Sequence, residues 1–136
     1  MFDLLIQGGR VIDGTGAPAI YASVAVEGDK LRVLRGDVSD LQTARRIDAT
    51  GKIVCPGFID IHAHSSLVIL DEPEHMPKVH QGVTTEVIGI DGMSYAPMRR
   101  KSDLHDLIWI NSGFDGSPKS AATWSSISEY LDVFDQ

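Results

Sequence analysis

The sequence has a single cysteine, Cys55, among its 136 residues, so no disulfide can form within the chain. Such sparse cysteine use suits a reducing compartment, and we expect a cytoplasmic protein. Basic residues are also few, because 12 Lys and Arg stand against 19 Asp and Glu, which gives a net charge of −7. This acidic balance argues against a partner that is a nucleic acid or an anionic membrane.

Long apolar runs are missing as well. No stretch approaches the roughly 20 apolar residues that cross a bilayer. The first ten residues lack the basic start of a signal peptide. The hydrophobic content of 43% is nevertheless enough for a core. We therefore expect a soluble protein with no membrane span and no signal peptide.

The richest chemistry lies in Lys52–His64, which reads KIVCPGFIDIHAH. Two apolar runs flank a Pro-Gly turn, and the second run contains Asp60, His62 and His64. Side chains on a strand alternate between its faces, so these three share one face. Two imidazoles about 6.5 Å apart along a strand can converge on one divalent ion, each at roughly 2.0–2.1 Å for zinc. Asp60 is placed to hold a ring N–H of one histidine.

Chance is the alternative explanation of the two histidines. Five histidines in 136 residues give about 0.2 such pairs at random. Burying two imidazoles and a carboxylate at the end of an apolar strand is costly unless they are paired or bound to metal. We therefore favour a metal site over accidental spacing.

Short strands dominate the first 55 residues. The apolar runs Phe2–Gln7 and Arg10–Asp13 around a Gly pair predict a hairpin or two short strands. Leu31 and Val33 alternate with polar residues and are expected to face the core, while Cys55 is expected to be a buried thiol. Further strand segments are Ala22–Glu27, Lys30–Leu34, Arg45–Ala49 and Ile53–Cys55. Together they predict a small antiparallel β unit.

The rest of the chain predicts strands that alternate with helices. Pro77–Gln81 can form a short helix, and the β-branched run Val83–Asp91 predicts a buried strand. Together with the strand before His62 they form a β–α–β unit, which favours parallel pairing. A later helix is predicted to begin at Ser102 as its N-cap and to stop at Gly113.

The last quarter of the chain predicts a loop and a final helix. Asn111–Ala122 is rich in Gly, Ser and Pro, which is typical of a loop. Ser126 and Glu129 fit a capping box at the start of the final helix. A stripe at helical spacing is expected to pack in the core: Trp124, Ile127, Leu131 and Phe134.

Asp91 ends the second predicted strand and is a further candidate metal ligand. Asp-Gly is a strong turn dipeptide, so the residue types alone favour a turn residue, and both interpretations stay open. Glu86 has the opposite strand parity and is not expected to share a site with Asp91. Surface or packing roles are expected for the other histidines, His75, His80 and His105.

The segment Pro56–His64, PGFIDIHAH, resembles the PGFIDxHxH signature of the amidohydrolase superfamily, which includes dihydroorotases, hydantoinases and D-aminoacylases. Asp3–Gly14 is similar to the start of that family, and Gln81–Gly92 resembles the second barrel strand of the D-aminoacylase branch. The resemblance implies an α/β fold in which both histidines bind a catalytic divalent metal, with zinc as the expected ion. In D-aminoacylases the position of Asp91 is typically a cysteine whose thiolate binds metal, so the aspartate leaves the ligand set open.

The same resemblance implies two parts. Residues 1–55 would be a portion of a small antiparallel β-sandwich. Residues 56–136 would be the first β/α units of a metal-dependent-hydrolase (β/α)8 barrel of the TIM type. Such a barrel needs at least about 200 residues. The barrel would therefore be incomplete here, and the sheet would have an unpaired edge.

The implied function is hydrolysis of the amide C–N bond of an N-acyl-D-amino acid, a small-molecule substrate. His62, His64 and Asp91 would be metal ligands, with Asp60 supporting a ring. The general base would come from a later strand, so this chain alone is expected to have little turnover. Two alternatives stay open: a cyclic amidohydrolase of the dihydroorotase or hydantoinase type, and a non-catalytic truncated fragment.

Overall fold

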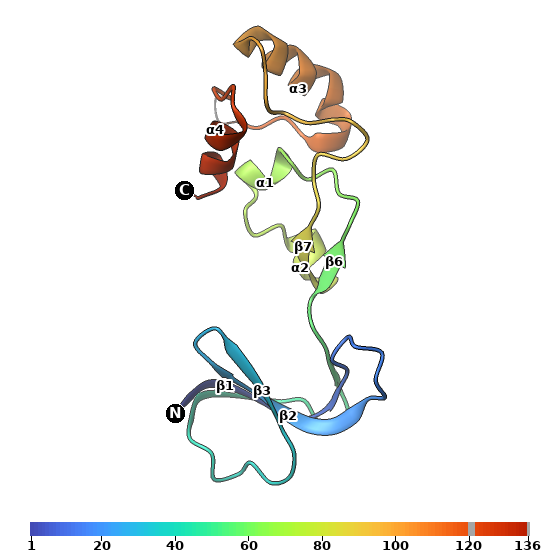
Figure 1. The fold of residues 1–136 in the computed structure, drawn as a ribbon, viewed down its shortest axis with the longest axis vertical. Helices are drawn as coiled ribbons and strands as arrows, with labels where there is room; N and C mark the ends of the chain where they lie inside the picture. The colour runs from blue at the N-terminus through green and yellow to red at the C-terminus, as the bar shows by residue number, and fades with distance from the viewer. Residues whose placement is uncertain (120–121, 136) are drawn as a thin grey trace. The chain divides into compact units, whose positions relative to one another are not determined.

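The computed structural model describes residues 1–119 and 122–135 (Figure 1). The chain divides into two compact units, Met1–Pro56 and Gly57–Gln136. In the described residues, the first unit is built from strands, whereas the second combines two strands with all of the helices. The protein is therefore a mixed α/β protein.

The first unit is a five-stranded sheet organised around β1 (Phe2–Val11). β2 (Ile20–Glu27) pairs antiparallel with β1, and β3 (Lys30–Leu34) pairs antiparallel with β2. β4 (Thr43–Asp48) and β5 (Ile53–Val54) both pair with β1 in parallel. The prediction of an antiparallel unit is therefore confirmed for β1, β2 and β3 and wrong for β4 and β5, because apolar alternation specifies the face of a strand but not its direction.

A single strand, β1, runs through Gly8 and Gly9, where a hairpin or two short strands were predicted. Its register with β2 shifts between Ile6 and Gly9, as at a β-bulge. Gly8 has a φ of 73°, and a Cβ on Gly9 would lie 2.5 Å from the side chain of Val54. The Gly pair thus allows a bulge and a close approach instead of reversing the chain.

The buried residues of the first unit form two clusters, one around Leu5 and one around Val24. Leu31 and Val33 were expected in the core but are 71% and 49% exposed. They lie on β3, the edge strand of the sheet. Cys55 is exposed as well, contrary to the predicted buried thiol, because it follows the two-residue strand β5 and lies outside both clusters.

The second unit begins with a parallel pair, as the β–α–β pattern predicted. β6 (Phe58–Asp60) pairs with β7 (Val83–Glu86). The short helices α1 (Val68–Asp71) and α2 (Met76–Val79) lie between them in the sequence. β7 is shorter than the predicted strand Val83–Asp91, because Glu86 pairs with Asp60, the last residue of β6. The prediction of a buried strand was wrong, since two of its four residues are exposed and two are half-buried.

Two longer helices follow, α3 (Lys101–Asp115) and α4 (Ile127–Asp132), and the short 3-10 helix η1 (Val133–Asp135) comes after α4. The N-cap of α4 is Ser126, and its capping box with Glu129 is confirmed.

The bounds predicted for α3 were wrong at both ends. Its N-cap is Arg100 instead of Ser102, and it continues past Gly113 to a C-cap at Gly116. A glycine inside a helix costs only about 1 kcal/mol, so Gly113 does not have to end α3. The first five residues of the predicted loop are therefore helical, while its positions 120 and 121 lie outside the described residues.

The core of the second unit joins the α3 and α4 regions to the segment after β6. Its buried members are Leu67, Tyr95, Ala96, Leu104, Ile108, Ala122, Trp124 and Tyr130. In the predicted apolar stripe Trp124 is buried, but Ile127 and Leu131 are 55% and 57% exposed and Phe134 is 37% exposed. α4 instead turns Tyr130 toward the core, so only part of that prediction is confirmed.

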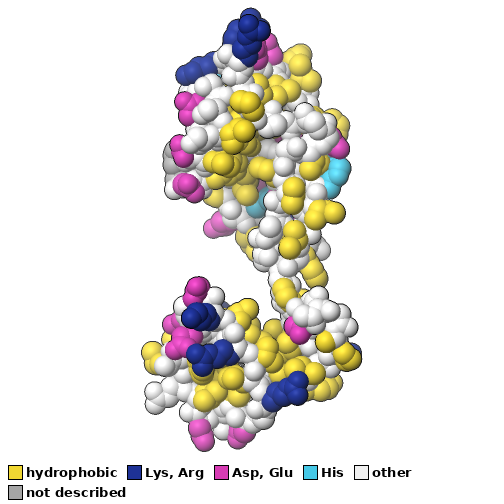
Figure 2. Space-filling model, viewed as in Figure 1, with side chains coloured by type: hydrophobic (Ala, Val, Ile, Leu, Met, Phe, Trp, Pro, Cys, Tyr) yellow, Lys and Arg dark blue, Asp and Glu magenta, His cyan; other side chains and the backbone are white. Residues whose placement is uncertain are grey.

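Apolar side chains remain on the surface of each unit (Figure 2). In the second unit these include Phe58 and Ile59 of β6, at 59% and 64% exposed, because this sheet has only two strands in the described residues. No helix within residues 1–119 and 122–135 has the length and apolar character needed to cross a membrane.

Candidate metal centre

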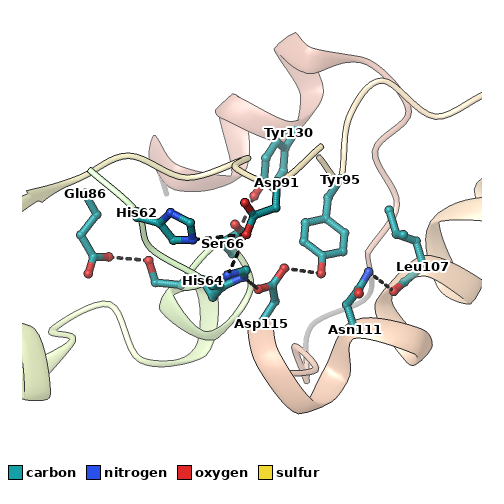
Figure 3. Close-up of polar contacts among 11 residues, drawn as sticks. His62, His64, Ser66, Glu86, Asp91, Tyr95, Leu107, Asn111, Asp115 and Tyr130 are labelled. Atoms are coloured by element: carbon teal, nitrogen blue, oxygen red, sulfur yellow. Dashed lines mark hydrogen bonds and ion pairs between the residues drawn. The ribbon is translucent and has the colours of Figure 1, made fainter. Parts of the chain in front are cut away.

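Three predicted site residues meet in the second unit. His62 and His64 follow β6, and Asp91 lies in the turn after β7. One potential ligand atom from each of them falls within a cluster whose atoms are all within 4.8 Å of one another (Figure 3). The parallel pairing of β6 with β7 sends both strand ends in the same direction, which brings these residues together.

The two imidazoles point at the same carboxylate oxygen. Nε2 of His62 lies 3.2 Å from Oδ2 of Asp91, and Nε2 of His64 lies 3.6 Å from that atom. The ring centroids are 5.6 Å apart and the ring planes are inclined by 57°. Two imidazole nitrogens and a carboxylate oxygen are a donor set that suits zinc.

Asp91 is the turn residue that its residue type favoured, and it also lies beside both histidines. Its φ of 57° places it in the left-handed region, which Asp tolerates better than most residues. It is thus a turn residue, and the turn aims its carboxylate at both histidines.

A buried carboxylate that sequence reasoning missed supports His64. Asp115, the last residue of α3, is 2% exposed. Its Oδ1 lies 2.9 Å from Nδ1 of His64, and its Oδ2 accepts a 2.6 Å hydrogen bond from the hydroxyl of Tyr95. Burial and the neighbouring Asp115 carboxylate raise the pKa of Tyr95 well above its usual value, so the phenol stays a donor.

These contacts at Nδ1 of His64 bear on whether its other ring nitrogen, Nε2, can bind a metal. A neutral ring that donates Nδ1–H to Asp115 carries a lone pair at Nε2. That lone pair faces Oδ2 of Asp91 at 3.6 Å, and the carboxylate oxygen is itself an acceptor. Two acceptors so placed repel each other, and either a proton on Nε2 or a cation bound to both atoms removes that repulsion. The residues present therefore fit a divalent metal ion.

Asp60 does not hold a histidine ring, so that prediction was wrong. Its Oδ1 accepts the backbone N–H of His62 at 3.0 Å, and its Oδ2 pairs with Nζ of Lys78. The hydrogen bond from Lys78, followed by that from His62, lowers the pKa of Asp60. The side chain closes an Asx-type turn at the end of β6, which directs it away from the imidazoles.

A second polar cluster lies around Glu86. Nζ of Lys78 is 3.2 Å from its Oε1, and Nδ1 of His75 is 3.4 Å from its Oε2. Ser65 donates its hydroxyl to the same Oε2. Burial acts to raise the pKa of Glu86, but the bonds from Ser65 and Lys78 outweigh it and lower that pKa. Glu86 therefore belongs to a separate cluster from Asp91, as its strand parity predicted.

The other histidines have the ordinary roles that were expected. His75 pairs with Glu86, and Nε2 of His105 lies 3.2 Å from the carbonyl of Ala122. His80 is exposed at the C-cap of α2.

Comparisons with known proteins agree on one family. Residues 45–134 match the model of the amidohydrolase family. The chain is 38% identical over 132 residues to D-aminoacylase of Alcaligenes xylosoxydans xylosoxydans, covering 97% of this chain and 26% of that protein. It is 45% identical over 95 residues to N-acyl-D-glutamate deacylase of the same organism, covering 70% of this chain and 19% of that enzyme.

Solved structures give the same result. A crystal structure of D-aminoacylase matches with a TM-score of 0.77 and 39% identity over 98% of this chain and 27% of that chain. N-acyl-D-glutamate deacylase of Bordetella bronchiseptica, complexed with zinc and a phosphonate inhibitor, matches with a TM-score of 0.79 and 32% identity over the same shares. The chain thus spans about a quarter of the length of these structures.

Proposed function

Because this chain belongs to the amidohydrolase family, we propose that it forms part of a metal-dependent hydrolase that cleaves the amide bond of N-acyl-D-amino acids. The observation that carries the proposal is the convergence of His62 and His64 on Asp91. Similarity to D-aminoacylase and to two further deacylases for N-acyl-D-amino acids supports the substrate class.

The complete fold that we propose is a (β/α)8 barrel joined to a small β-sandwich. This chain spans 26% of D-aminoacylase, so the remaining strands would supply the general base and further ligands. A cytoplasmic location is part of the proposal, and the single cysteine supports it.

His62, His64 and Asp91 would hold the metal, and we propose zinc because imidazole and carboxylate donors suit it. A bound divalent ion supplies polarisation of the scissile carbonyl and a lowered pKa of coordinated water. The residues of this chain would prepare the site for it. Asp115 lies 2.9 Å from Nδ1 of His64 and can accept a hydrogen bond from it, and the carboxylate of Asp91 would offset the positive charge of the ion. The side chains of His62 and Asp91 are 59% and 54% exposed, so further ligands from the remaining strands could reach the ion.

Zinc titration of the 136-residue chain tests the site. Competition with a chromophoric chelator should give one zinc per chain. His62→Ala and His64→Ala should each weaken binding strongly, whereas His80→Ala, at an exposed position, should leave it unchanged. If neither His62→Ala nor His64→Ala changes the zinc affinity, the metal site is refuted and the non-catalytic alternative is favoured.

A chimera tests the reaction. This chain would replace the corresponding quarter of D-aminoacylase, and the product would be assayed on N-acetyl-D-amino acids and on cyclic ureides. We expect turnover of the former, abolished by His64→Ala. Turnover of cyclic ureides alone would overturn the substrate class.

A further inference from the structure

The position of Asp115 is costly for a carboxylate. It is 2% exposed and ends α3, where the helix dipole disfavours negative charge. Its partners offset these costs, and within residues 1–119 and 122–135 the side chains that contact it are the His64 ring at 2.9 Å and the Tyr95 hydroxyl at 2.6 Å (Figure 3). The contact with His64 therefore helps to stabilise the buried carboxylate of Asp115 and to fix its orientation.

Tyr95 fixes the orientation of that carboxylate. Its side chain is 1% exposed within the core of the second unit. Its backbone carbonyl accepts a 2.8 Å hydrogen bond from Nε1 of Trp124. The phenol donates to Oδ2 of Asp115, which leaves Oδ1 for the His64 ring.

We propose that Tyr95 and Asp115 are positioning residues that hold His64 in the tautomer with its proton on Nδ1 and its lone pair on Nε2. This inference rests on the proposed function, since that lone pair serves a metal. Within the described part of the chain, the charged partner of the His62 ring is Asp91, and its side chain is 59% exposed. The two histidines thus differ in how firmly their rings are held. The buried partners set the orientation of the His64 ring before metal binds, and the exposed His62 ring adjusts when the metal binds.

The tautomer can be measured without any substitution. The metal-free chain, labelled with 15N in its histidine rings, would be studied by two-bond 1H–15N correlation at a pH where the rings are neutral. We expect His64 as the Nδ1–H form, and exposed His80 mainly as the Nε2–H form that free histidine favours. A His64 ring that carries its proton on Nε2 would overturn the inference.

Asp115→Asn tests the consequence for metal binding. The phenol of Tyr95 still needs an acceptor, so it holds the amide oxygen and turns the NH2 group toward His64. That group donates to Nδ1 and moves the ring proton to Nε2. Zinc affinity should therefore fall roughly 10–100-fold, the usual range for a partner of a ligating histidine. The matched control is Asp132→Asn on α4, which is exposed and should bind zinc like the natural chain.

A double substitution separates positioning from structural damage. Without the phenol, the amide of Asn at 115 can turn over and accept from Nδ1–H again. Asp115→Asn combined with Tyr95→Phe should therefore bind zinc more tightly than Asp115→Asn alone. If the loss of zinc affinity in the double variant equals the sum of the losses in Asp115→Asn and in Tyr95→Phe alone, the inference would be overturned.

The outcomes distinguish this inference from the proposed function. If His64→Ala abolishes zinc binding but Asp115→Asn has a zinc affinity within twofold of that of the natural chain, only the positioning role is refuted. If the natural chain binds no zinc, the metal site is refuted, and the tautomer measurement still decides the positioning role. Circular dichroism would check the fold of each variant. If Asp115→Asn does not fold, the tautomer of the natural chain decides.

Discussion

Replacing Trp124 by Phe tests how the core beneath the metal centre is held. Trp124 is 3% exposed, and its Nε1 donates a 2.8 Å hydrogen bond to the carbonyl of Tyr95. Phe keeps an aromatic ring against Tyr130, whose ring centroid lies 5.0 Å from that of Trp124. The main change is then a buried carbonyl without its partner, which costs about 1–3 kcal/mol.

For a unit of this size, a loss of about 2 kcal/mol lowers Tm by roughly 8–16 °C. All described helices lie in the second unit, so thermal unfolding followed by circular dichroism at 222 nm reports on that unit. Trp109→Phe is the matched control, because Trp109 is 80% exposed and should change stability by less than about 0.5 kcal/mol. Equal Tm values for the two variants would refute the reasoning.

Three further predictions concern other parts of the chain. Asp91→Cys should raise zinc affinity, because a thiolate is the softer ligand. It should also give the cobalt-loaded chain an intense near-ultraviolet band. An unchanged spectrum would contradict metal ligation from this position. The pKa of Glu129 is lowered from 4.5 to about 2 by hydrogen bonds from the backbone of Ser126 and Ser125, so its stabilisation is complete above about pH 4.5 and is lost as the pH falls through about 2. Glu129→Gln should remove this acid-dependent part of the 222 nm signal, and a persisting acid transition would count against the capping box as its source. Gly9→Ala would place a Cβ 2.5 Å from the Val54 side chain and lower the free energy of unfolding by roughly 1–3 kcal/mol. Adding Val54→Ala should restore part of this stability, as measured by urea unfolding. No restoration would argue against the clash.

Local sequence patterns predicted which residues meet at the site but not the backbone that carries them. β6 ends at Asp60, so His62 and His64 lie beyond the strand on which period-two spacing had placed them. The parallel pairing of β6 with β7 still brings Asp91 to the same end as both histidines. The capping box at Ser126 is equally local and was also predicted correctly.

Features that depend on tertiary packing were not predictable in this way. Asp115 lies 51 residues from His64, inside a segment whose composition indicated a loop, and the packing of α3 extends the helix to include it. Asp60 was assigned to a ring because its parity matched, but Lys78 and the His62 backbone take its two oxygens. The parallel pairing of β4 with β1 depends on chain direction, which residue alternation does not specify.

The most direct test of the central claim is zinc K-edge X-ray absorption on the 136-residue chain loaded with one equivalent of zinc. The proposed centre predicts scattering from two imidazoles at roughly 2.0–2.1 Å, reduced to one in His62→Ala and in His64→Ala. A spectrum without imidazole scattering, or one that neither substitution changes, would contradict a metal centre formed by His62, His64 and Asp91.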